Sequence, residues 1–391
     1  MARVARVIIT DGQSIAALAA ARSLGSQGIR IDCGETSFLC PTFMSRHVRR
    51  RFLYPAAEDD PNAFVERVRK QVQASHYDAV IPIRDATSLA LSMNRDRIEP
   101  FARVLATDHS ILMRGRDKQL TLQAARRAGI PHPRTLYPET DGLARAQQEL
   151  QFPVLVKPAM SSGTRGITIV RKPGQLGSAY TQVVKEYGPS MIQELIPGTT
   201  MYCYSTIRHD GQDVREFMQI QTRNYPVHGG TAASGQSIVK SELRDFSRRL
   251  LDELRWDGIA HVEFKLDPRD GVIKLMEINP RFWMSLQLAI ASGVDFPGDL
   301  LRLAKEGKLP PQKPYRIGVT YRWLLPADIL WFASASDRRA HARSYLRFIG
   351  RDITYAILSF RDPLPAIGAV LQSFRFLSSK EKRRFTFRRG W

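Results

Sequence analysis

The sequence has few cysteines and no long apolar run, which removes several protein classes from consideration. Its 391 residues include three cysteines, Cys33, Cys40 and Cys203, without Cys-x-x-Cys or Cys/His spacing. Neither a disulfide framework nor a zinc site is therefore expected. The apolar stretch 15–24 is too short and alanine-rich to span a membrane, and no cleavable apolar segment opens the chain. We expect a cytoplasmic protein.

Three familiar motifs are also missing. No Gly-Lys-Ser/Thr follows the small-residue loop 159–167, which argues against a P-loop kinase. Only Gly12 stands where a dinucleotide fingerprint needs three glycines, so NAD is not expected. No Gly-x-Ser-x-Gly elbow marks a serine nucleophile.

Acidic residues are fewer than basic residues: the sequence has 38 Asp and Glu and 58 Lys and Arg, which gives a formal net charge of +20. This balance suggests an anionic substrate, such as an acidic amino acid or a carboxylated precursor that also carries phosphate. Apolar residues, at 43%, permit a sizeable core. The length predicts two or three domains.

The most informative stretch is 272–285. Its apolar, β-branched run predicts a strand that Pro280 ends. Because side chains alternate along a strand, Glu277 and Asn279 face the same way, with Arg281 two places further on. Carboxylate and amide oxygens suit Mg²⁺, and a guanidinium suits phosphate or an acyl phosphate. The stretch predicts a site for a hard cation that carries phosphate.

A second acid, Glu263, lies in another predicted strand, 260–267, and a turn at 268–271 joins the two strands. The resulting hairpin can place Glu263 beside Glu277, so that two carboxylates share one or two Mg²⁺ ions. The alternative is a hairpin with two ordinary exposed acids.

The N-terminal part predicts a parallel sheet. A strand at 6–10, a helix at 14–26 capped by Ser14 and a strand at 29–33 give the βαβ order. The segment 78–87 reads as a further strand with a polar end, which makes Arg84, Asp85 and Thr87 candidate substrate contacts. A capped turn in which Asp85 or Thr87 starts a helix is an equally favoured alternative to the strand.

Residues 110–300 resemble the ATP-grasp superfamily. The resemblance rests on the two acidic strands, on the strand 152–158 with Lys157, on the small-residue loop 159–167, on the hinge 192–198 and on Lys118 at a helix start. It implies ATP and Mg²⁺ as cofactors, with metal ligands Glu263, Glu277 and Asn279. The ATP contacts that it implies are Lys118, Lys157, Ser161, Ser162, Gly163, Thr164, Gly166, Gln193, Glu194, Leu195 and Ile196.

In that family the acid of the hinge accepts a hydrogen bond from the adenine amino group, a role that falls on Glu194. The two loop serines become phosphate donors rather than nucleophiles. One departure is clear: many members hold the ribose with an acid just beyond the hinge, and the stretch 199–203 has none. Thr200, Tyr202 or another strand takes that role.

The loop 221–231 lies between the hinge and the acidic hairpin. Its glycines after a histidine, Gly229 and Gly230, can offer backbone donors to a transferred phosphoryl group, and Arg223 can clamp a substrate carboxylate. In related ligases the loop at this place lies over the reacting acyl phosphate. His228 alone is more often a surface histidine, and phosphate contact is the favoured interpretation here.

The resemblance implies a ligase of the carboxylate–amine (carboxylate–thiol/amine) type. ATP phosphorylates a carboxylate, an amine attacks the acyl phosphate, and ADP and phosphate leave. Lys157 would neutralise the triphosphate and Arg281 would stabilise the acyl phosphate, which makes them the catalytic residues. Two alternatives stay open: a member that uses bicarbonate or a non-amine nucleophile, and a non-catalytic nucleotide-binding protein at the membrane surface.

The expected fold class is α/β and α+β. It comprises a Rossmann-like domain over 1–110, a two-part ATP-grasp core over 111–315 (divided as 111–200 and 201–315) and a basic, mostly helical extension over 316–391. The extension carries 15 Lys and Arg against 5 Asp and Glu, with aromatic residues interleaved. It is expected to wrap the core, with peripheral contact to an anionic membrane as an alternative. No nucleic-acid motif is legible, and a homodimer is an open option.

Overall fold

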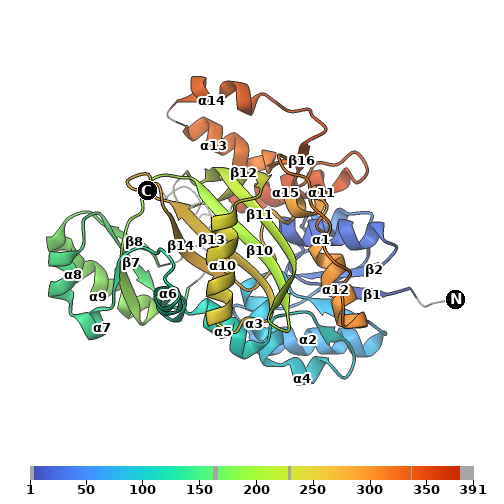
Figure 1. The fold of residues 1–391 in the computed structure, drawn as a ribbon. Coiled ribbons are helices and arrows are strands. Elements are labelled where there is room, and N and C mark those ends of the chain that lie inside the picture. Colours follow the sequence, from blue (N-terminus) through green and yellow to red (C-terminus); the bar gives the residue numbers. More distant parts are fainter. Residues whose placement is uncertain (1–3, 162–165, 228–229, 336, 379–391) are drawn as a thin grey trace.

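The computed structural model describes residues 4–161, 166–227, 230–335 and 337–378, and it contains three β-sheets (Figure 1). The N-terminal sheet has the strand order β3-β2-β1-β4-β5, and every neighbouring pair is parallel. The predicted parallel sheet is therefore confirmed. Its strands are β1 (Arg6–Ile9), β2 (Arg30–Glu35), β3 (Val48–Leu53), β4 (Ala79–Ile81) and β5 (Arg103–Val104).

The helices of this part are α1 (Ile15–Ser26), α2 (Pro61–Ala74), α3 (Asp85–Met93) and α4 (Arg95–Ile98). Ser14 caps α1, as predicted, by accepting a hydrogen bond from the amide of Ala16. Of the two predictions for 78–87, the helix that starts at Asp85 is confirmed: β4 ends at Ile81 and α3 begins at Asp85, so the strand does not extend to residue 87. The buried carboxylate of Asp11 accepts hydrogen bonds from Thr87 (2.6 Å) and from the amide of Arg84 (3.0 Å), which fixes this strand-to-helix turn.

The second sheet is antiparallel, with the order β6-β9-β7-β8. Helices α8 and α9 cover it at the green end of Figure 1, and α6 begins beside it. The strands are β6 (Thr135–Leu136), β7 (Val154–Pro158), β8 (Thr168–Val170) and β9 (Ser190–Glu194). The helices are α5 (His109–Arg116), α6 (Lys118–Arg127), α7 (Pro138–Asp141), α8 (Leu143–Glu149) and α9 (Leu176–Tyr187).

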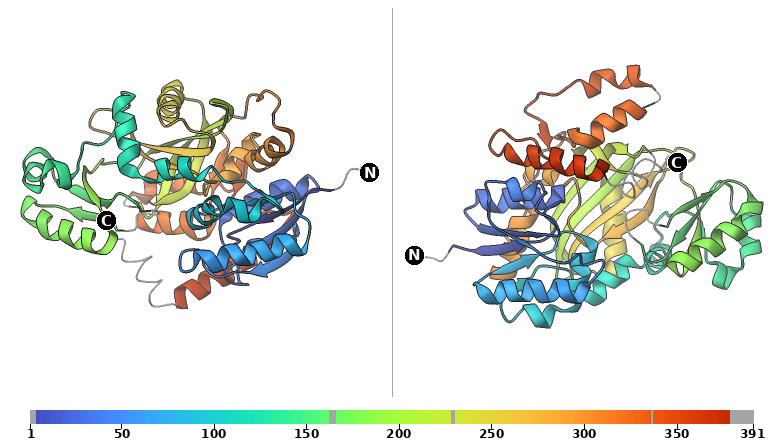
Figure 2. Two further views of the ribbon diagram at one scale, coloured as in Figure 1. Left: turned by 90° about the horizontal axis from the view of Figure 1, so that it is seen from below. Right: turned by 180° about the vertical axis from the view of Figure 1, so that it is seen from behind.

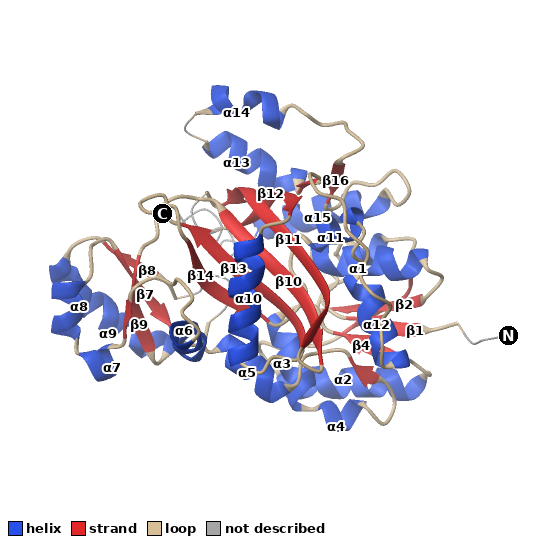
Figure 3. Ribbon diagram, in the orientation of Figure 1, coloured by secondary structure: helices blue, strands red, loops and turns tan. Residues whose placement is uncertain are grey.

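The third sheet has seven strands in the order β14-β13-β10-β11-β12-β15-β16 and forms the centre of the molecule (Figure 3). Strands β13 and β14 form the predicted hairpin at one edge. The core strands are β10 (Met201–His209), β11 (Gln212–Tyr225), β12 (Thr231–Ile238), β13 (Gly258–Leu266) and β14 (Ile273–Asn279). The helices between and after them are α10 (Ser241–Glu253), α11 (Leu286–Ser292) and α12 (Phe296–Glu306). Helix α10 lies across one face of this sheet, and α11 and α12 pack against α1.

The C-terminal part corrects the predicted boundary at residue 316. Strand β15 (Thr320–Arg322) pairs with β12, and β16 (Ile353–Tyr355) pairs with β15, so the sheet continues into the segment expected to be a mostly helical extension. Short strands after a glycine carry too weak an alternating pattern to be recognised. The helices here are α13 (Ile329–Ser334), α14 (Arg338–Tyr345) and α15 (Leu364–Ser378).

Helix α15 lies against the N-terminal part of the chain (Figure 2). The buried carboxylate of Asp362, just before it, accepts hydrogen bonds from Arg22 (2.9 Å), Ser45 (2.7 Å) and the amide of Arg46 (3.0 Å). These contacts tie the end of the described chain to its beginning. Among the described residues, no helix combines the length and apolar character that crossing a bilayer requires.

Candidate functional site

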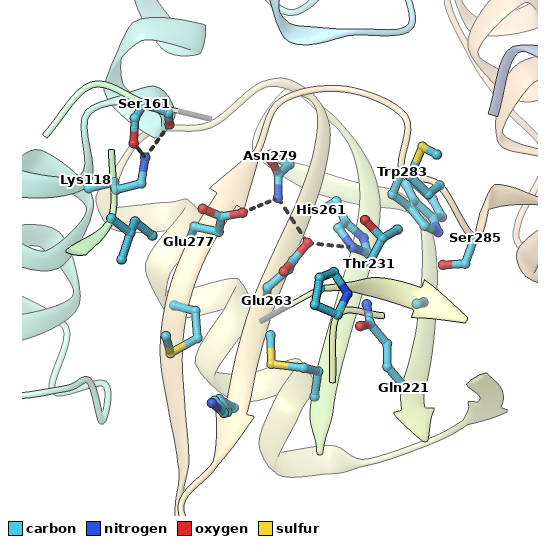
Figure 4. Close-up of a pocket in the computed structure, with 18 of the residues that line it drawn as sticks. Lys118, Ser161, Gln221, Thr231, His261, Glu263, Glu277, Asn279, Trp283 and Ser285 are labelled. Atoms are coloured by element: carbon cyan, nitrogen blue, oxygen red, sulfur yellow. Dashed lines mark hydrogen bonds and ion pairs between the residues drawn. The ribbon is translucent and has the colours of Figure 1, made fainter. Parts of the chain in front are cut away.

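One pocket lies between the four-stranded sheet and the seven-stranded sheet (Figure 4). Its lining comes from β7 on one side and from β10 to β14 on the other, with the start of α6 at one end. The polar residues that line it are Lys118, Lys157, Ser161, Gln221, Thr231, His261, Glu263, Lys265, Glu277, Asn279, Arg281 and Ser285.

Two carboxylates face each other in this pocket, as the hairpin predicts. Glu263 and Glu277 are direct cross-strand partners. The amide nitrogen of Asn279 donates to Oε1 of both, at 3.1 and 3.2 Å, and its Oδ1 accepts from Arg281 at 3.0 Å. Two carboxylates joined by an amide form an oxygen-rich set that suits Mg²⁺, because the amide can turn its oxygen toward a cation. Among the described residues no group of three or more His, Cys, Asp and Glu fits a metal.

His261 orients the first of these acids. Its Nε2 lies 3.4 Å from Glu263, and its Nδ1 lies 2.8 Å from the hydroxyl of Ser205. Its ring stacks on Trp283, with 4.8 Å between centroids. Burial acts to raise the pKa of Glu263, but the hydrogen bond and charge of His261 outweigh it and hold that pKa below its usual value. The carboxylate is thus kept ionised.

Two buried lysines stand opposite the acids. Lys157, on β7, is 5% exposed, and Lys118, the first residue of α6, is 6% exposed. Burial and the neighbouring charge of Lys118 lower the pKa of Lys157 to about 8. Burial also lowers the pKa of Lys118, whose amine donates to the backbone oxygen of Ser161. Neither amine forms an ion pair with a described acid, and buried ammonium groups of this kind are prepared to accept an anion.

The rest of the pocket is partly apolar, and of its apolar residues only Leu195 was among the predicted ATP contacts. Leu155, Ile167, Leu195 and Met201 line it, which provides a slot that suits a planar ring. Lys265 also lines it, and burial lowers the pKa of its amine. The alternation of strand side chains carried the signal for this residue, since 261, 263 and 265 share one face of β13.

The N-terminal candidates reach the site through one ion pair. Asp85 lies 3.0 Å from the Nε of Arg281. Although burial opposes it, the charge of Arg281 lowers the pKa of this acid. Arg84 instead faces Glu58 at 3.7 Å, and Thr87 is buried in its bond to Asp11. Only Asp85 among these candidates contacts a residue of the pocket.

Several predicted contacts lie elsewhere. The side chain of Glu194 accepts from the amide of Arg134 (2.9 Å) and pairs with Arg269 (3.1 Å), so its carboxylate is occupied outside the pocket. Gln193 is buried and donates to Thr135, and Ile196 is buried as well. Neither these two nor Glu194 lines the pocket, whereas the adjacent Leu195 does. The hinge therefore meets the pocket through Leu195, not through its acidic side chain.

The candidates in the loops 159–167 and 221–231 also differ in whether they line the pocket. Arg223 pairs with Asp328 at 2.9 Å and does not line the pocket, because an irregularity in β11 on either side of it changes the direction of its side chain. Gly230 lines the pocket, and Gly166 lies beside it with φ of +76°, close to Pro158 and Tyr187. The remaining candidates, Ser162, Gly163, Thr164, His228 and Gly229, lie outside the described residues.

Comparison with known proteins identifies this arrangement. Residues 214–325 match the family described as ATP-grasp in the biosynthetic pathway with Ter operon. The sequence is 28% identical over 207 residues to D-alanine–D-alanine ligase from Francisella tularensis, covering 49% of this chain and 67% of that protein. The chain is therefore similar to the ATP-grasp superfamily. The predicted resemblance is confirmed.

Other ATP-grasp proteins match more of the chain. The sequence is 25% identical over 248 residues to the carbamoyl phosphate synthase large chain of Halomonas eurihalina, covering 59% of this chain. The matched region spans only 23% of that larger protein. Biotin carboxylase from Campylobacter jejuni has a similar fold (TM-score 0.67, 16% identity), with 81% of this chain and 74% of that chain covered. N5-carboxyaminoimidazole synthetase from Staphylococcus aureus, solved with ADP, gives 0.61 at 15% identity, covering 81% and 80%.

Proposed function

We propose that this protein is an ATP-dependent ligase that activates a carboxylate as an acyl phosphate and joins it to an amine. One observation carries the proposal: the carboxylates of Glu263 and Glu277 face the buried amines of Lys118 and Lys157 across one pocket. Acids that suit Mg²⁺ and cations that suit phosphate are what phosphoryl transfer from ATP requires.

The side chains have separate roles in this proposal. Glu263, Glu277 and Asn279 would hold Mg²⁺, which supplies positive charge to the phosphates. Lys118 and Lys157 would neutralise the remaining phosphate charge, and the slot beside Leu195 would accept the adenine ring. Of the loop residues, Gly166 and Gly230 would approach the phosphates through their backbones.

The reaction proceeds in two displacements. A carboxylate oxygen of the substrate attacks the terminal phosphorus of ATP, the bond to the bridging oxygen breaks, and ADP leaves. The amine nitrogen then attacks the acyl carbon, the bond to the phosphate oxygen breaks, and the nitrogen loses a proton. Arg281, which Asp85 holds in place, would stabilise the acyl phosphate, with Asp85 as a positioning residue.

The relatives leave two alternatives. The similarity to the carbamoyl phosphate synthase large chain keeps a member that uses bicarbonate or a non-amine nucleophile as the first alternative. A non-catalytic nucleotide-binding protein would not need the paired acids. Peripheral contact with an anionic membrane is a further proposal, since Phe360, Leu364 and Ile367 are exposed beside Arg361. Cosedimentation with anionic but not with neutral vesicles tests it.

The deciding experiment measures ADP and phosphate release with Mg-ATP against a panel of amino acids, singly and in pairs, with mass spectrometry of the products. Release that needs two partners, with a product lighter by one water than their sum, supports the ligase. Release with bicarbonate alone supports the carboxylase alternative. ATP binding without release across the panel, including carboxylates that carry phosphate, contradicts the proposal.

A further inference from the structure

A second pocket lies next to β11 and β12, two strands that also contribute residues to the candidate site. It is bounded by β11, β12 and β15 on one side and by α13 and α14, at the top of Figure 1, on the other. Arg223, Arg322, Arg343, Arg347, His341 and Trp331 line it. We call it the arginine pocket. None of these six residues lines the pocket that holds Glu263 and Glu277.

The floor of the arginine pocket holds an excess positive charge. The side chains of Arg223 and Arg322 are 8% and 1% exposed, and both pair with one carboxylate, that of Asp328, which is fully buried. Arg223 donates to its Oδ1 at 2.9 Å, and Arg322 donates to its Oδ2 at 2.7 Å. Two guanidinium groups share one acid. One net positive charge is therefore withdrawn from water, which is costly unless an anion compensates it.

Most hydrogen-bond donors of these two arginines have no acceptor among the described residues. Each guanidinium has five N–H groups, ten in all. Within the described residues, the hydrogen bonds of the pair are the two to Asp328 and one from Arg322 to the backbone oxygen of Arg347 at 2.9 Å. The Nη2 of Arg322 lies 2.6 Å from Oδ2 of Asp328, so this ion pair occupies it. The donors of Arg223 beyond its one bond to Asp328 have no acceptor among the described residues, and Arg223 lines the cavity, where a ligand can reach them.

Aromatic rings fix the two guanidinium groups. Arg223 lies over Trp331 at 5.2 Å, and Arg322 lies over Tyr345 at 5.2 Å and over Phe348 at 4.6 Å. Stacking of this kind holds a planar cation in place while its edges stay free to donate. The edges of the two guanidinium groups therefore form a preorganised surface for an oxyanion.

The rim adds further positive charge. Arg347 is paired with Asp352 at 2.8 Å, whereas Arg343 is exposed and forms no ion pair with a described acid. The pocket thus contains four arginines and two carboxylates that pair with them, those of Asp328 and Asp352. The net charge is +2, before any contribution from His341. This value fits an anion with two negative charges.

We propose that the arginine pocket binds the phosphate or carboxylate groups of a small dianionic molecule. Arg223 and Arg322 bind the anion at the floor, and Arg343 closes the contact at the rim. The fork geometry of the guanidinium groups matches both oxyanions, so the pocket defines the charge and the oxygen pattern of its ligand. This site is separate from the proposed ATP site and does not depend on it.

The test is calorimetric titration of the full chain with inorganic phosphate and, in a second arm, with succinate, at low salt. Each titration is run without nucleotide and again with saturating Mg-ADP, which fills the phosphate sites near Lys118 and Lys157. We expect binding of at least one of the two anions with ADP present. The anion that binds more tightly shows whether the pocket prefers a phosphate or a dicarboxylate.

The decisive variant is Arg343→Glu, because this exposed side chain can change without disturbing the fold. We expect its anion affinity to fall about tenfold or more, and that of Arg343→Gln to fall less. Arg339→Glu is the matched control: it lies on the same helix, is exposed, does not line the pocket, and makes the same change of charge. Its affinity should fall clearly less than that of Arg343→Glu, since Arg339 lies one helical turn away and does not line the pocket.

Three results would overturn the proposal. The first is absence of binding at about 10 mM of either anion, a concentration that corresponds to almost no specific contact. The arginines would then serve only to hold Asp328 and its turn against the sheet. The second is loss of binding when ADP is present, which would assign the anion to the ATP pocket. The third is equal affinity in Arg343→Glu and Arg339→Glu.

Discussion

Nucleotide binding to this protein should take up a proton at alkaline pH, and Lys157 should be the group that receives it. Burial and the nearby Lys118 lower the pKa of Lys157 to about 8 in the free protein. A bound triphosphate favours the charged amine, because an opposite charge at short range raises the pKa of a lysine. The pKa should then return toward the unperturbed value of about 10.4.

The size of the effect follows from these two values. At pH 9 a group with a pKa of about 8 is roughly one-tenth protonated, and one with a pKa of about 10.4 is almost fully protonated, so binding takes up about 0.9 proton. At pH 7 both forms are protonated and uptake falls to about 0.1. The dissociation constant for ATP should therefore rise about tenfold between pH 7 and pH 9, since affinity is lost as pH rises through the free pKa.

Calorimetry in two buffers with different ionisation enthalpies measures this uptake directly. The matched variant is Lys157→Met, which keeps an unbranched side chain only one atom shorter and removes the titrating group. It should bind ATP more weakly, and its affinity should change little between pH 7 and pH 9. Wild-type protein that takes up no proton at pH 9, or a Lys157→Met variant with the same uptake as wild type, would refute the assignment.

Two further predictions concern the acids and the core. Glu277→Gln should lower Mg²⁺-dependent ADP release about 100-fold or more while leaving the melting temperature nearly unchanged, because it removes one charged oxygen ligand. Turnover near the wild-type rate in this variant would contradict the metal site. Gly115→Ala should lose about 1–3 kcal/mol of stability, because its Cβ would lie 2.5 Å from the buried ring of Trp256. Denaturant unfolding checks this, with Gly174→Ala, whose Cβ meets nothing within 4 Å, as the control.

The sequence predicted best what depends on local periodicity. The hairpin of β13 and β14, the facing acids Glu263 and Glu277, and the end of β14 before Pro280 all follow from alternation and from the missing amide of proline. The parallel arrangement of the first strands follows from the alternation of strand, helix and strand in the sequence. These features are encoded within about twenty residues each.

What the sequence could not provide is the side-chain direction set by distant partners. Glu194 was expected at the adenine ring, but Arg269, 75 residues later, draws its carboxylate away. Arg223 was expected at the substrate, but the irregularity in β11 turns it toward Asp328, which lies 105 residues away. Neither contact leaves a local signal, because both depend on how separate segments pack.

The central sheet also has a consequence for how the chain is made. The N-terminal sheet uses residues 6–104 and the four-stranded sheet uses 135–194, whereas the seven-stranded sheet draws on 201–355. At roughly 5–20 residues per second of translation, the first two sheets can form while the third still lacks β15 and β16. During that interval β12 is an open edge, and open edges are where nascent chains associate with one another. Pausing of the ribosome before residue 320 would prolong this exposure, so the yield of folded protein should depend on how quickly the last strands emerge.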